Sequence, residues 1–164
     1  MSVEIKELTG DLFIETANMI SKLAQYKKNK QDKRNDYFDQ QSIRSLTKWC
    51  HEGTIYNIFH DQQLIGFCYV KFTQDLAYLE DVYIKKDFLK DGISKKAFKA
   101  LDQILKNKNV ESLLVYVSPK NTRMLHFYRE CGFDHLNQLQ LKKNYNDHLN
   151  KHDNIEILGF DFKR

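Results

Sequence analysis

With 164 residues, of which 41% are hydrophobic and 13% aromatic, the chain can bury one good core but is too short for two ordinary domains. We therefore expect a single domain over residues 1–164. The sequence shows neither the pattern of a signal peptide nor an apolar run near the ~20 residues that span a bilayer, so we expect a cytoplasmic protein with no membrane partner.

The cysteines and the basic residues exclude two further classes of protein. Cys50, Cys68 and Cys131 are an odd number without paired spacing, which fits neither a disulfide framework nor a tetrahedral metal site. We expect packed thiols and no metal. One dense basic stretch, residues 27–34, comes without the aromatic platform or recognition helix of a nucleic-acid-binding protein, so we expect no nucleic acid partner and a solvated helix end.

The first part of the chain predicts a short strand and two helices. Residues 3–8 are strand-like, and apolar residues near helical spacing indicate a helix from Asp11 onward. A second helix is expected over about residues 40–50, with Asp39 as its N-cap.

Three strands are expected next. Residues 54–60 and 63–72 predict a hairpin with a two-residue connection. Residues 77–84 continue the strand pattern, but Glu80 and Asp81 place two adjacent acids where a simple alternation would have one. These acids need a functional or structural explanation.

The last part of the chain predicts helices and strands in alternation. A helix over residues 92–105 has an apolar stripe and a lysine-rich opposite side. A strand over residues 112–117 leads to a helix opened by Ser118 as cap and Pro119 as first helical residue. Two closing strands are expected near residues 134–142 and 155–162. Strand pairs on both sides of helical crossovers indicate an α+β protein with a mixed sheet flanked by helices.

Two segments together suggest a family. The first contains Leu79-Glu80-Asp81-Val82-Tyr83-Ile84 and Leu89-Lys90-Asp91-Gly92-Ile93-Ser94, and the second contains Ser118-Pro119-Lys120-Asn121, Phe127-Tyr128 and Cys131-Gly132-Phe133. In order and spacing they resemble the acetyl-CoA and acceptor motifs of the GNAT N-acetyltransferase superfamily, over about residues 64–133. The resemblance implies a single-domain fold with a mixed, mostly antiparallel sheet of about six to seven strands flanked by about four helices. The Leu-Glu-Asp strand looks nearest to the polyamine and diamine acetyltransferase branch.

The resemblance assigns acetyl-CoA, the acetyl donor, to the first segment. A strand splayed from its neighbour by a bulge pairs with the pantetheine amides, here through the backbone around Tyr83, from Val82 to Ile84. The loop and helix N-terminus that follow receive the pyrophosphate. The residues expected there are Leu89, Lys90, Asp91, Gly92, Ile93 and Ser94, of which Gly92 matches best.

The resemblance also assigns catalytic roles. Asn121 bonds the pantetheine arm, Phe127 packs near the cofactor, and the phenol of Tyr128, with an ordinary pKa of ~10, protonates the departing sulfur. Glu80 is the expected base for the incoming amine, with Asp81 in reserve. Because alternate strand residues face opposite sides, these two acids should diverge unless a bulge intervenes.

Two functions remain open from the sequence. The first is acetyl transfer to a primary amine of a small molecule, polyamine-like or other. A homodimer is common in the family, but the sequence leaves the oligomeric state open. Tyr37, Phe38 and Trp49 then line an acceptor pocket or belong to the core. The second is a binding or sensing domain that keeps the fold without catalysis, since Leu89 and Ser94 depart from the family pattern and Asp91 adds a negative charge near the expected phosphates.

Overall fold

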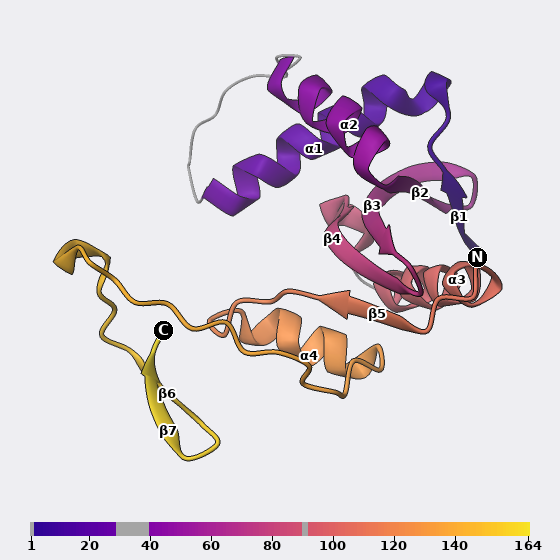
Figure 1. Cartoon of the computed structure of the whole chain (residues 1–164). Coiled ribbons are helices and arrows are strands. Elements are labelled where there is room, and N and C mark those ends of the chain that lie inside the picture. Colours follow the sequence, from indigo (N-terminus) through magenta and orange to yellow (C-terminus); the bar gives the residue numbers. More distant parts are fainter. Residues whose placement is uncertain (1, 29–39, 90–91) are drawn as a thin grey trace. The chain divides into compact units, whose positions relative to one another are not determined.

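The computed structural model describes residues 2–28, 40–89 and 92–164 (Figure 1). The chain forms two compact units, one within residues 1–116 and one within residues 117–164, and each is described in turn. Among the described residues, no helix is both long enough and apolar enough to cross a membrane.

The first unit is built on a five-stranded sheet in the order β1-β2-β3-β4-β5. Neighbouring strands are antiparallel except for β4 and β5, which are parallel. The strands are β1 (Val3–Glu7), β2 (Thr54–His60), β3 (Gln63–Thr73), β4 (Leu76–Ile84) and β5 (Ser112–Val115). The helices are α1 (Phe13–Lys28), α2 (Gln40–Glu52) and α3 (Ile93–Asn107), with short 3-10 turns at Gly10–Leu12 and Lys86–Phe88.

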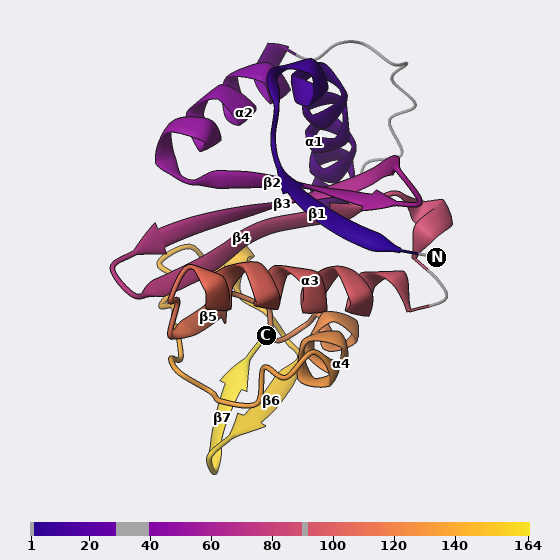
Figure 2. The ribbon, with the colours of Figure 1, turned by 90° about the vertical axis from the view of Figure 1, so that its right-hand side faces the viewer.

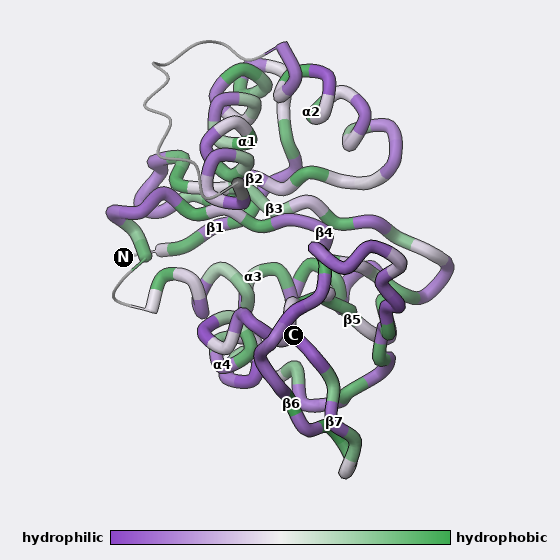
Figure 3. The backbone as a smooth tube through the Cα atoms, turned by 90° about the vertical axis from the view of Figure 1, so that its left-hand side faces the viewer, coloured by the Kyte–Doolittle hydropathy of each residue, from purple (hydrophilic) through white to green (hydrophobic). Residues whose placement is uncertain are grey.

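Helices cover both faces of this sheet. Figure 2 shows α1 and α2 on one face and α3 on the other. On the α1/α2 face, Leu46 of α2 packs with the sheet residues Phe67 and Tyr69. On the α3 face, Ile93 and Ala97 pack with sheet isoleucines. In Figure 3, hydrophobic residues recur along the strands of the five-stranded sheet and along α3.

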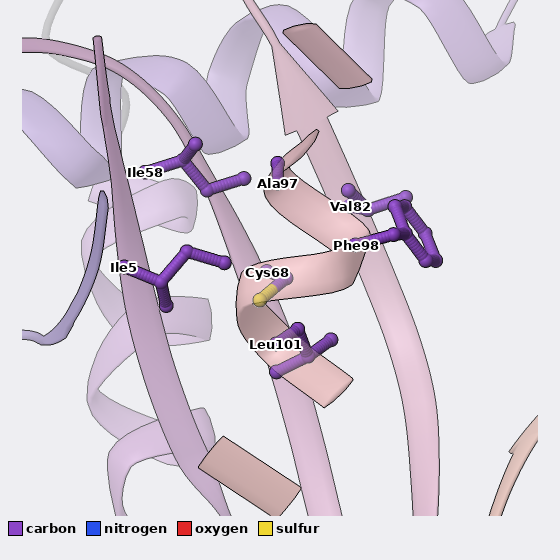
Figure 4. Close-up of a pocket in the computed structure, with 7 residues that line it drawn as sticks. All are labelled: Ile5, Ile58, Cys68, Val82, Ala97, Phe98 and Leu101. Atoms are coloured by element: carbon purple, nitrogen blue, oxygen red, sulfur yellow. The ribbon is translucent and has the colours of Figure 1, made fainter. Parts of the chain in front are cut away.

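A small apolar cavity lies between the sheet and α3, beside the thiol of Cys68 (Figure 4). Burial raises the pKa of Cys68 to about 12. This thiol therefore stays protonated at neutral pH and is a packing residue. The cavity is lined by Ile5, Ile58, Cys68, Val82, Ala97, Phe98 and Leu101.

The predicted hairpin between β2 and β3 is confirmed. His60 pairs with Gln63, and the two residues between them, Asp61 and Gln62, have φ values of 46° and 69°. Two consecutive residues with positive φ form the kind of tight turn whose twist matches that of the flanking strands.

The second unit contains α4 (Thr122–Glu130), a 3-10 turn at Asp147–Leu149 and a two-stranded sheet, β6 (Asn154–Ile157) with β7 (Phe160–Lys163). The helix starts later than predicted. Asn121, not Ser118, is its N-cap, and Thr122, not Pro119, is its first helical residue. An Asn side chain serves as a cap as well as a Ser does, so the sequence offered two competing starts.

Both predicted closing strands need correction. Residues 134–142 form no strand, and Leu136 and Leu141 are 71% and 68% exposed. Asn and Gln lie among these leucines, and the segment has no β-branched residue to favour a strand. The single strand predicted over residues 155–162 is a hairpin, because Leu158 and Gly159 have φ values of 54° and 82° and turn the chain.

Several predictions concern residues outside the described ranges: the Asp39 cap, the loop residues Lys90 and Asp91, the aromatics Tyr37 and Phe38, and most of the basic stretch. They stay predictions, as does the single domain.

Candidate active site

The two adjacent acids lie at an irregularity in β4. Tyr69 of β3 pairs with Asp81, but the next residue, Val70, pairs with Leu79. Glu80 is therefore an extra residue on β4, which is a β-bulge. The sequence predicted that these acids diverge unless a bulge intervenes, and a bulge lies at this position.

The bulge turns both acids toward the α1/α2 face. Asp81 forms an ion pair with Lys27 of α1, and its side chain is only 15% exposed. Glu80 is exposed, and its charge raises the pKa values of Tyr69 and Lys71, so its carboxylate lies near both. Because Tyr69 belongs to the core cluster under α1 and α2, the two acids share this face of the sheet.

The edge of β4 beyond the bulge has no strand paired to it in the part of the chain that the structure describes. Pairing with β5 runs from Leu76 to Leu79 and stops there, while β4 continues to Ile84. On the other edge, the N–H group of Lys85 donates to the carbonyl of Ile65 on β3. Backbone groups of alternate residues point to opposite edges of a strand, so those of Val82 and Ile84 point away from β3. Their backbone groups are therefore placed where an extended ligand could pair, and their role as cofactor-binding residues stays a prediction.

The loop after β4 ends at the start of α3. Gly92 is the N-cap of α3 with φ of 70°, and a Cβ added there would meet nothing within 4 Å. The glycine is thus favoured by its backbone conformation and not by lack of space. A glycine cap has no side chain to accept from the first-turn N–H groups of the helix, and no acidic residue lies in that turn. Such a helix start is suited to a phosphate group.

The neighbouring loop residues differ in burial. Leu89 is 48% exposed, Ile93 is buried, and Ser94 is half-buried. Ile93 is therefore a core residue of the α3 face, which its hydrophobic type predicts.

In the second unit, α4 carries three of the predicted site residues. The side-chain oxygen of Asn121 accepts a hydrogen bond from the N–H group of Met124 at 3.2 Å. This cap uses the amide oxygen of Asn121 as an acceptor. Tyr128 is buried, and its ring lies edge-on to Phe133 and tilted against Phe127, with centroids 5.2 and 5.8 Å away. The tyrosine is therefore held rigidly by its ring.

A cluster of aromatic and charged side chains beside Glu80 was not predicted from the sequence. Trp49 of α2 stacks on Tyr69, and Lys71 makes a 3.1 Å ion pair with Glu52. No local motif links these residues, because only the register of β2 and β3 and the packing of α2 bring them together. Trp49 was expected in an acceptor pocket or in the core, and it packs against the core cluster.

A bulged strand with an open edge, followed by a glycine-capped helix, is the arrangement that the sequence resemblance implies. The model of the acetyltransferase (GNAT) family matches residues 21–133, which is more than half of the chain. The chain belongs to this family. It is an acyltransferase of the GNAT type, and the α+β GNAT fold predicted from the sequence is confirmed. None of the curated proteins compared with the chain matches it.

Solved structures show the same fold at low identity. The PaiA N-acetyltransferase from Thermoplasma acidophilum in complex with coenzyme A is 22% identical, with a TM-score of 0.61 over 82% of this chain and 91% of its own. The aminoglycoside acetyltransferase meta-AAC0020 from an uncultured soil metagenomic sample is 19% identical, with a TM-score of 0.62 over 88% and 95%. A possible acetyltransferase from Clostridium difficile 630 is 14% identical, with a TM-score of 0.67 over 89% and 99%.

Proposed function

We propose that this GNAT protein transfers the acetyl group of acetyl-CoA directly to a primary amine of a small molecule. The observation that carries the proposal is the open edge of β4 beyond the Glu80 bulge, with two carboxylates beside it. Neighbours of the same fold, such as the PaiA enzyme, were crystallised with coenzyme A, which supports acetyl-CoA as the donor.

The residues of this chain fit such a donor in two places. The backbones of Val82 and Ile84, with Tyr83 between them, pair with the amides of the pantetheine arm. The contribution of Asn121 and Phe127 to this arm rests on the family resemblance alone. The loop from Leu89 through Gly92 to Ser94 and the start of α3 receive the pyrophosphate, helped by Lys95 and Lys96 in the first turn.

The chemistry needs one base and one acid from the protein. The donor supplies an acetyl group activated as a thioester. Glu80 takes a proton from the acceptor ammonium, directly or through water, and the neutral amine nitrogen then attacks the acetyl carbonyl. A carbon–nitrogen bond forms, the carbon–sulfur bond breaks, and the Tyr128 hydroxyl gives its proton to the departing sulfur. The nitrogen loses its second proton through solvent, which returns a proton to the Tyr128 oxygen, and Glu80 releases its own proton to solvent. No nucleophilic residue of the protein is needed, which agrees with the raised pKa of Cys68.

The acceptor class follows from the charge of this face. Glu52, Glu80 and Asp81 lie near the proposed position of the amine and favour cationic acceptors. Polyamine-like compounds are the first choice, as the Leu-Glu-Asp strand suggests. Aminoglycosides come next, since structural neighbours include aminoglycoside acetyltransferases.

The test measures release of free thiol from acetyl-CoA with a panel of polyamines, amino acids and aminoglycosides. The binding of acetyl-CoA alone is measured in parallel by calorimetry. Turnover with at least one amine, together with micromolar binding of acetyl-CoA, supports the enzyme. Absence of any binding heat overturns it in favour of a sensing domain, in which Leu89, Asp91 and Ser94 have replaced a productive phosphate loop.

A further inference from the structure

The ammonium group of Lys71 is held by the ring of Tyr69 and by the carboxylate of Glu52, the last residue of α2. The Nζ atom of Lys71 lies 5.6 Å from the centre of the Tyr69 ring and 3.1 Å from a carboxylate oxygen of Glu52. The hydrogen bond to Glu52 raises the pKa of Lys71, and the charge of Glu80 adds to the rise. We call the group formed by Trp49, Glu52, Tyr69 and Lys71 the Tyr69 site.

The ring in this site is fixed. Trp49 stacks on Tyr69 with centroids 4.7 Å apart and planes 11° apart. On another side, a Cβ atom added at Gly53 would lie 2.9 Å from a ring carbon of Tyr69, so the backbone is packed closely against the ring. A rigid aromatic surface next to carboxylates is the chemistry that recognises an alkyl ammonium.

The hydroxyl of Tyr69 lacks a hydrogen-bond partner of normal geometry among the described residues, although the residue is only 2% exposed. Burial raises the pKa of Tyr69, and the nearby Lys71 charge works against that rise. A buried hydroxyl left without a good partner costs free energy, and a structure normally satisfies it with a protein group, water or a ligand. The Lys71 ammonium lies beside this hydroxyl, so a second ammonium that replaces the lysine meets a polar group there as well as the ring and Glu52.

Lys71 can leave this position. Its side chain is 36% exposed and that of Glu52 is 38% exposed, so both are reached by solvent. Ion pairs at such exposure contribute little stability, about 0–1 kcal/mol, and an ammonium from solution can replace the lysine.

We propose that the acceptor carries a second ammonium group and that the Tyr69 site binds it, with Lys71 occupying the site until the acceptor arrives. This rests on the proposed function. Glu80 serves the amine that is acetylated, and Glu52 and the Tyr69 ring hold the other ammonium, so the acceptor is a diamine or a longer polyamine. The new assignment is that Trp49, Glu52 and Tyr69 decide acceptor specificity and that Lys71 competes with the substrate.

The kinetic experiment compares 1,4-diaminobutane with butylamine, at saturating acetyl-CoA, in the wild type, Lys71→Gln and Lys22→Gln. Lys22 is exposed on α1, so its variant removes the same charge elsewhere. Lys71→Gln lowers the KM of the diamine by about two- to five-fold relative to that of butylamine, whereas Lys22→Gln leaves this ratio at the wild-type value. In the double variant Lys71→Gln with Glu52→Gln, the KM of the diamine relative to that of butylamine is no longer lowered. An unchanged ratio in a folded Lys71→Gln protein, checked by circular dichroism, overturns the proposal.

A binding measurement separates this proposal from the proposed function. Calorimetry with 1,4-diaminobutane and no acetyl-CoA measures binding without catalysis, and the comparison of the two variants isolates the part that depends on the Tyr69 site. Tighter binding to Lys71→Gln than to Lys22→Gln supports the site even if no amine is acetylated, in which case only the proposed function fails. Equal binding to the two variants, with acetylation intact, overturns the site and leaves the proposed function in place.

Discussion

The side-chain amide of Asn57 on β2 donates a 2.8 Å hydrogen bond to the hydroxyl of Thr16 on α1, and both residues are fully buried. This polar pair ties the first helix to the sheet inside an otherwise apolar layer. Replacing Thr16 by Val keeps the shape of the side chain but leaves the Asn57 NH₂ group without its acceptor. We expect the free energy of unfolding to fall by about 1–3 kcal/mol, measured by urea denaturation.

Thr47→Val is the matched control for this change. Thr47 lies on the exposed side of α2, and its hydroxyl donates to the carbonyl of Ile43 at 2.9 Å, one turn earlier. Water replaces that bond, so the variant stays within about 0.5 kcal/mol of the wild type. Equal decreases in the free energy of unfolding in the two variants would mean that the buried Asn57–Thr16 hydrogen bond stabilises the protein no more than the exposed one.

Tyr128→Phe tests the proposed acid. The ring packing against Phe127 and Phe133 is kept, so stability changes little, while the proton donor is lost. We expect kcat to fall by about 10²- to 10⁴-fold with a much smaller change in the KM of the amine. Tyr145→Phe, at a residue that is 88% exposed, keeps the wild-type kcat. Full turnover by Tyr128→Phe would remove Tyr128 from the mechanism.

Glu80→Gln and Asp81→Asn decide which acid is the base. Loss of the base lowers kcat at neutral pH by about 10²-fold. The loss shrinks as the pH approaches ~10, where an alkyl amine sheds its proton in solution without help. We expect this pH-dependent rescue for Glu80→Gln. If Asp81→Asn shows it instead, the base is Asp81 and the Lys27 pair must open during turnover.

Gly92→Ala tests the start of α3 as the phosphate site. Alanine at a φ of 70° costs about 1 kcal/mol of stability and shifts the N–H groups of the first turn. Gly159→Ala, at a φ of 82° in the β6/β7 turn, gives a similar backbone strain away from the site. Only Gly92→Ala should raise the KM of acetyl-CoA, by several-fold. Equal KM values for acetyl-CoA in the two variants would mean that the pyrophosphate does not bind at the start of α3.

The sequence predicted the central part of the fold well because its signals there are local. Continuous runs of apolar and aromatic residues predicted β2 and β3, and the turn between them, at Asp61 and Gln62, followed from the two strands that flank it. The α3 stripe was equally clear, and Gly92 marked its start. The β6/β7 turn was marked only by Gly159, and the residue before it, Leu158, is unusual at a positive φ, so the segment was predicted as one strand.

The candidate site was predictable where it depends on neighbours in sequence and not where it depends on register. Glu80 and Asp81 drew attention because they break an alternation, but which face they share depends on how β4 pairs with β3. The Lys71–Glu52 pair depends on the β2–β3 hairpin and the end of α2 together. No single-sequence pattern joins residues from three elements in that way.

The buried thiol of Cys68 makes stability depend on pH above neutrality. Its pKa is raised from 9.0 to about 12 by burial, so the folded state keeps the proton at a pH where the unfolded chain has lost it. A raised folded pKa means that this contribution is fully present below pH 9 and is lost progressively as the pH rises from 9 toward 12. Between pH 8 and pH 10 the loss amounts to about 1.4 kcal/mol.

Cys68→Ala has no thiol to ionise, and although it is less stable at pH 8, its free energy of unfolding should fall less over the same interval. Urea denaturation at pH 8, 9 and 10 measures the difference, and parallel curves for the two proteins would mean that the thiol ionises in the folded state as readily as in the unfolded one.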